Sequence, residues 1–272
     1  YCADGWVSGA VVSAKSLAHD TTLLAILKLD ADQADPWPSI RESLSLLYWM
    51  NEIDIHHFVK EQASYDIGDS HIYARCFLHS MALQAGANDI AQWLAPFMFN
   101  VLRHGGWFAE DKVFAHFYAL LLEAQITGKW IPATAVTSPL PLEVIQLLQA
   151  LPDPAKLPDV LVQYADWRLA RANGYPDASS TKKRGHYVFS ESWWGVFPFE
   201  LFAVQAIFRS CTGNDISLKA HHPLLTTVLM QTPPPLMPLI ETPEVATLKA
   251  FVKRVFGDEW QPLSPVAVLP VA

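Results

Sequence analysis

The stretch that decides the fold is YVFSESWWGVFPFELFAVQAIFRSCTG, residues Tyr187–Gly213. Beyond Pro198, apolar side chains recur at helical spacing and form a wide stripe: Phe199, Leu201, Phe202, Ala203, Val204, Ala206, Ile207 and Phe208. A helix that is apolar nearly all round is normally enclosed by other elements, and each aromatic side chain buries roughly 150–250 Å². The helix carries one acid, Glu200, and one base, Arg209. The stretch therefore predicts the centre of a core and not a catalytic site.

The composition is that of a folded protein. The chain has 272 residues, of which 51% are apolar and 17% are charged, so it can bury a core as one large domain or two small ones. No window reaches eighteen apolar residues without interruption by a charge, a proline or a histidine, which predicts no membrane span. We find no signal peptide in the printed sequence and expect a cytoplasmic protein.

Helix signals recur along the whole chain, and no segment alternates as a strand would. Apolar periodicity predicts helices over about 7–29, 39–58, 70–85, 88–104, 108–127, 142–151, 158–173, 199–212, 223–230 and 243–256. Ser39 and Glu42 have the spacing of a capping box, and Pro243 suits the first position of the last helix. We predict an all-α fold of stacked antiparallel helical hairpins.

The domain organisation is predicted from prolines. Residues 132–141 contain three prolines and no periodicity, so they are the best candidate for a boundary. The fold is then either a single compact domain or two helical subdomains. The first, 1–131, would be acidic; the second, 132–272, would hold the aromatic core and a proline-rich tail without visible structure.

Charge is distributed unevenly. The formal net charge is −8, which argues against a nucleic-acid partner because such a protein needs a basic face to neutralise phosphates. Residues 1–72 contain eleven acids and four bases, so nearly the whole excess lies in the first quarter. It is consistent either with a solvated helix face or with a surface that attracts a basic partner.

Motifs for chemistry are scarce. Glu52 and His56 have i,i+4 spacing, but Glu-x-x-His and His-Glu-x-x-His do not occur, so we predict no metal site. Gly-x-Ser-x-Gly, glycine-rich phosphate loops and Cys-x-x-Cys are missing too. We therefore predict neither an enzyme nor a cofactor. A pocket near His56 and His57 stays as the enzymatic alternative, and a helical adaptor for peptides as the other.

Residues 164–208 resemble the C-terminal half of PoNi-type immunity proteins. The segment YADWRLARANGY is followed by a polar loop and by FPFELFAVQAIFR, and the family's motif positions would be held by Tyr164, Asp166, Trp167, Phe199 and Glu200. The likeness spans about fifty residues. TPPPLMP (232–238) and the proline-rich tail have no place in that pattern.

The resemblance implies a cytoplasmic, all-helical immunity protein of a bacterial type VI secretion effector–immunity pair. Such a protein binds its cognate toxin, a PoNe-type DNase, and blocks its active site; no nucleic acid, membrane, cofactor or metal is implied. An acidic surface would suit a basic toxin. The candidate contact residues are the acids of the first quarter: Asp30, Asp32, Asp35, Glu42, Glu52, Asp54, Glu61, Asp66 and Asp69. Asp166 and Glu200 are expected to hold the fold together by pairing with Arg168, Arg171 or Arg209.

Overall fold

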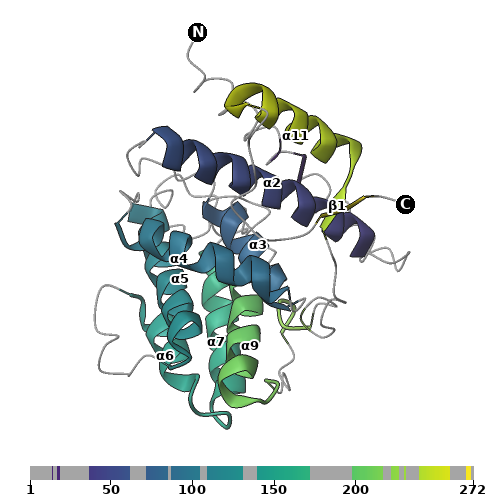
Figure 1. The fold of residues 1–272 in the computed structure, drawn as a ribbon. Helices are drawn as coiled ribbons and strands as arrows, with labels where there is room; N and C mark the ends of the chain where they lie inside the picture. The colour runs from purple at the N-terminus through teal and green to yellow at the C-terminus, as the bar shows by residue number, and fades with distance from the viewer. Residues whose placement is uncertain are drawn as a thin grey trace. The chain divides into compact units, whose positions relative to one another are not determined.

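The computed structural model describes residues 14, 17–18, 37–61, 72–84, 87–104, 109–130, 140–171, 198–216, 222–226, 230, 239–257 and 268–270. These residues form eight helices and two strands of three residues each (Figure 1). The predicted all-α class is confirmed. Within the same residues, no helix is both long enough and apolar enough to cross a membrane.

Two compact units make up the chain, and they alternate along the sequence. Unit 1 comprises 1–67, 85–93 and 234–272, and unit 2 comprises 68–84 and 94–233. This division differs from the predicted subdomains 1–131 and 132–272, because the proline segment falls within unit 2. Residues 132–139 of that segment lie outside the described residues. Prolines interrupt helices, but they do not decide which apolar faces pack together.

Unit 1 is built on α2 (Trp37–Glu61). The helix begins at Trp37, with Pro38 in its first turn, where a missing N–H costs little. Ser39 is consequently inside the helix and buried, so the predicted capping box does not mark its start. From Leu44 to Ile53 the helix is buried on nearly every side, and Tyr48 contacts Trp93 with ring centroids 5.5 Å apart. The weak amphipathic pattern of α2 thus reflects burial all round.

The last part of unit 1 is β1 (Leu239–Glu241), α11 (Pro243–Phe256) and β2 (Val268–Pro270). Thr242 caps α11 by accepting a hydrogen bond from the Val245 N–H at 3.2 Å, and Pro243 follows it, as predicted. The strands pair in parallel, with Leu239 opposite Val268. The tail predicted to lack structure therefore contributes a short strand. Both α11 and β1 contact α2, and Figure 1 shows α11 lying along it.

Unit 2 contains α3 (Ile72–Gln84), residues 94–104 of α4 (Asn88–His104), α5 (Ala109–Thr127), α6 (Leu142–Ala150), α7 (Leu157–Ala170) and α9 (Phe199–Thr212). The helix α9 packs against α3 and α5, whereas α6 packs against α7 (Figure 1). The starts and ends of these six helices agree with the prediction to within a few residues. The helix predicted at 223–230 is wrong for residues 223–226, which form a turn closed by hydrogen bonds from the Leu225 and Thr226 N–H groups to the His222 carbonyl. Nearly all of the helix predicted at 7–29 lies outside the described residues.

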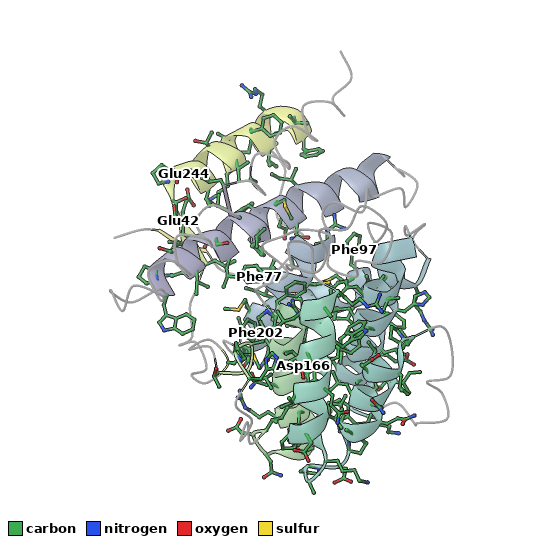
Figure 2. All side chains as sticks on the ribbon, turned by 180° about the vertical axis from the view of Figure 1, so that it is seen from behind. Glu42, Phe77, Phe97, Asp166, Phe202 and Glu244 are labelled. Carbon is green, nitrogen blue, oxygen red and sulfur yellow. The ribbon has the colours of Figure 1, made fainter. Side chains whose placement is uncertain are left out.

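The aromatic stretch forms α9, and it is buried as predicted. All residues from Phe199 to Phe208 except Gln205 are buried. The ring of Phe199 packs edge-to-face against that of Phe114 of α5, with ring centroids 5.6 Å apart. Figure 2 labels Phe77 of α3 and Phe202 of α9, both of them core residues. Gly213 ends the helix at φ 72°, a conformation that costs glycine little, and its N–H donates to the Arg209 carbonyl. The part of the aromatic stretch before Pro198 lies outside the described residues; it includes Ser190, whose residue type suits a helix cap.

Candidate functional site

The nine predicted contact acids fall into three groups. Asp30, Asp32, Asp35, Asp66 and Asp69 lie outside the described residues. Asp54 and Glu61 belong to α2, but their side chains are outside the described part. Glu42, labelled in Figure 2, is half-buried on α2, and Glu52 is buried there. The structure thus describes two of the nine side chains.

Glu52 is a correction to the predicted surface. Its side chain is 0% exposed, and the Tyr48 hydroxyl one turn earlier donates a hydrogen bond to Glu52 Oε1 at 3.2 Å. Leu46, Met50 and Ile53 of the same helix are buried too. The apolar residues on either side of Glu52 in the sequence were therefore a signal of its burial. Glu52 belongs to the interior of unit 1 and not to its acidic surface.

The two units carry very different charges. Unit 1 has fifteen acidic and seven basic residues, a net charge of −8, whereas unit 2 has twelve of each. The whole formal excess of the chain thus belongs to unit 1. Within the described residues of unit 1, Lys249 pairs with Glu241. We call unit 1 the acidic unit.

Unit 2, by contrast, contains a buried ion pair. The Arg168 guanidinium binds the Glu200 carboxylate through two hydrogen bonds, from Nε to Oε1 and from Nη2 to Oε2, the latter at 3.2 Å. Both side chains are 0% exposed, and the Tyr164 hydroxyl donates to Oε1 at 3.2 Å. The prediction that Glu200 pairs with a nearby arginine is confirmed. Burial raises the pKa of Tyr164 well above 10, so the phenol stays neutral.

Asp166 holds a different partner from the one predicted. It is 72% exposed on α7 (Figure 2), and its Oδ1 lies 3.3 Å from Nε2 of His222, not beside an arginine. His222 Nδ1 accepts a hydrogen bond from the Leu224 N–H at 3.1 Å. The ring proton must then be on Nε2, facing the carboxylate. His222 joins the 222–226 turn to α7, and its Nδ1 is not available as a base.

Two further reactive groups of unit 2, His79 and Cys76, are buried. Burial lowers the pKa of His79 from 6.5 to about 4, and its two ring nitrogens contact Tyr118 and Gln125. Burial also raises the pKa of the Cys76 thiol well above 9, so Cys76 is protonated at neutral pH and a poor nucleophile. The sequence offered one signal for this cluster, because Cys76 and His79 are spaced to share a helix face.

The enzymatic alternative rests on residues that the structure does not describe. The side chains of His56 and His57 on α2 lie outside the described part. Among the side chains that are described, no three from His, Cys, Asp and Glu gather at a distance that suits a metal ion.

Comparison with known proteins gives no relative: no family model matches the chain, and no curated protein or solved structure is significantly similar to it.

Proposed function

We propose that this chain is an immunity protein that binds a basic antibacterial toxin through its acidic unit and blocks it. The observation that carries the proposal is the division of charge, −8 in unit 1 and zero in unit 2. A toxin that acts on DNA needs basic residues around its active site to hold phosphates. An acidic protein can occupy the same residues.

The division of charge favours fast capture of such a toxin. Charge of one sign concentrated in one part of a molecule attracts an oppositely charged partner and raises the association rate. Unit 2 adds nothing to the net charge, and its buried ion pair joins two of its helices. In this proposal unit 2 supports the fold, and unit 1 provides the recognition.

The resemblance at Tyr164–Phe208 gives the toxin its class, a DNase delivered by a type VI secretion system. Four of the five motif positions serve the core, because Tyr164, Phe199 and Glu200 are buried and Trp167 is nearly so. The fifth, Asp166, is exposed. A shared core motif is consistent with a shared helical framework.

Co-expression with the neighbouring open reading frame tests the proposal. We expect the neighbour to be toxic alone, to damage DNA, and to be harmless when this chain is present. A neighbour that is harmless alone, or whose toxicity persists on co-expression, would contradict the proposal.

Kinetics with the purified toxin test the electrostatic part. We expect the association rate to fall by about tenfold or more as salt is raised from low to physiological ionic strength, because screening shortens the range of attraction. An association rate that does not depend on salt would show that the acidic unit does not attract the toxin electrostatically. Equal binding to several unrelated proteins would indicate an adaptor instead.

A further inference from the structure

His79 lies in the core of unit 2 and is held by two residues of another helix. It belongs to α3, and its side chain is 0% exposed. Its Nδ1 is 2.9 Å from the Tyr118 hydroxyl, and its Nε2 is 2.7 Å from Gln125 Oε1. Tyr118 and Gln125 are both on α5, two turns apart, so they contact opposite ends of the imidazole.

The Tyr118 hydroxyl fixes the proton on one side of the ring. It lies 2.9 Å from the Cys76 carbonyl oxygen, which can only accept a hydrogen bond. Two oxygens at this distance need a proton between them, and the only one available is that of the Tyr118 hydroxyl. The hydroxyl oxygen must then accept a hydrogen bond from the imidazole, so His79 carries a proton on Nδ1.

The other side of the ring depends on the charge of His79. A neutral imidazole with its proton on Nδ1 has a bare Nε2, which needs a donor. The Gln125 amide supplies one when its NH₂ faces the ring. An imidazolium has an N–H at Nε2 as well, and the Gln125 oxygen then accepts from it, as in the orientation described here. Because the two ends of an amide have nearly the same shape, both arrangements fit the same site.

We infer that His79, Tyr118 and Gln125 form a proton switch in the core of unit 2, in which proton uptake by His79 turns the Gln125 amide over. Every hydrogen bond of the network is kept in both states. What changes is the charge: the neutral state has none at His79, and the protonated state places a cation inside the contact between α3 and α5. The inference goes beyond the proposed function and does not depend on it.

The charged groups around His79 do not stabilise its protonated form. On its own helix His79 has Arg75, which adds positive charge, and Cys76, whose thiol is neutral. From α5 it faces Tyr118, a neutral phenol. The one carboxylate of α9, Glu200, is paired with Arg168 of α7. The environment therefore favours the neutral ring, in keeping with the pKa of about 4 that burial imposes on His79.

Nitrogen NMR of the imidazole in the whole, wild-type chain tests the switch directly. At pH 7 we expect neutral His79 with its proton on Nδ1. As the pH falls, we expect Nε2 to gain a proton with a midpoint near 4, and the Gln125 side-chain amide signals to change with the same midpoint. A proton on Nε2 at pH 7, or Gln125 signals that do not follow the His79 transition, would overturn the inference.

A variant gives a second test. In Gln125→Glu the carboxylate can only accept, so it stabilises the proton on Nε2, and we expect the His79 midpoint to move upward by at least one pH unit, about a tenfold gain in proton affinity. The matched control is Gln149→Glu, which places the same charge on an exposed position of α6. The control should leave the midpoint within a few tenths of a unit. Equal midpoints in Gln125→Glu and the wild type would refute the switch; if Gln125→Glu does not fold, the wild-type titration decides.

Discussion

Arg168 of α7 and Glu200 of α9 form an ion pair from which water is excluded, with both side chains 0% exposed. The chain separates the two residues by 32 positions, and the Tyr164 hydroxyl adds a third hydrogen bond to the carboxylate. Removing two charges from water is expensive, and the attraction between them offsets that cost only while both are present. We therefore expect the contact between α7 and α9 to depend on both members of the pair.

Replacing one member of this pair should strongly destabilise the protein. For Glu200→Gln and for Arg168→Met we expect the free energy of unfolding to fall by about 3–5 kcal/mol, because each leaves a buried charge or polar group without its partner. Denaturant unfolding followed by circular dichroism measures this change. The double variant Arg168→Met, Glu200→Leu should recover much of the loss, because no buried charge remains.

An exposed pair on the same helix provides the control. Arg209 of α9 pairs with Asp215, but Asp215 is 75% exposed. For Asp215→Asn we expect a loss of at most about 1 kcal/mol, since solvent screens the pair. Comparable losses in Asp215→Asn and Glu200→Gln would show that burial does not strengthen the dependence on the partner.

His79 should make the stability of unit 2 depend on pH between about 6.5 and 4. Its pKa is about 4 in the folded protein and 6.5 when unfolded, so in this window the unfolded chain binds more protons. The contribution of neutral His79 to the free energy of unfolding is fully present above pH 6.5. It falls as the pH drops through this window, and the total loss is about 3 kcal/mol. The measurement is the difference in unfolding free energy between the wild type and His79→Gln across this range, which cancels the common titration of carboxylates. A difference that is constant with pH would contradict the assignment.

Glu52→Gln should affect stability and spare the partner. The buried carboxylate accepts a hydrogen bond from Tyr48, so its replacement is expected to cost about 1–3 kcal/mol of unfolding free energy. The association rate with the toxin should stay within about twofold, because a buried group contributes little to steering. Stopped-flow association and thermal unfolding separate the two effects. A variant of unchanged stability that binds the toxin more slowly would show that Glu52 contacts the toxin after all.

The position of α11 on α2 should depend on Lys249. Its ammonium group binds the Glu241 carboxylate and lies 5.5 Å from the centre of the Trp49 ring, while the Ile240 N–H donates to Ser45 Oγ at 3.0 Å. For Lys249→Ala we expect a loss of about 0.5–1.5 kcal/mol and faster amide hydrogen exchange along α11. Lys253→Ala, an exposed change on the same helix, should leave the exchange unaltered. Unchanged amide hydrogen exchange in both variants would show that Lys249 does not fix the position of α11.

The helices could be predicted because a helix depends on residues that are close to one another in the sequence. The apolar stripe after Pro198 predicts both α9 and its burial, and Thr242 with Pro243 predicts the start of α11. Glu200 was identified as structural because the stretch around it is apolar. The start of α2 was missed because Ser39 has the residue type of a cap, although the chain is already helical at Trp37.

Contacts between distant residues could not be predicted in this way. Prolines at 132–141 suggested a boundary, yet α3 packs on α9 from across that segment. Charge alone places Glu52 among the candidate contact residues, although it follows the apolar run 46–50, and the structure shows that it is buried. Likewise, the sequence does not tell which residue of α5 meets His79, because Tyr118 and Gln125 are about forty positions away.

The acidic unit should govern association with the toxin, and variants of matched charge test this. Replacing Asp30, Asp32 and Asp35 by Asn removes three negative charges from unit 1; replacing Asp153, Asp159 and Asp166 removes three from unit 2. At low salt we expect the first variant to associate about tenfold more slowly and the second to change by less than about twofold, because nearby charges steer the encounter. High salt should abolish the difference, since the attraction is then screened. If both variants slow association equally, the net charge of the molecule is what attracts the toxin, and the recognition role of unit 1 is lost.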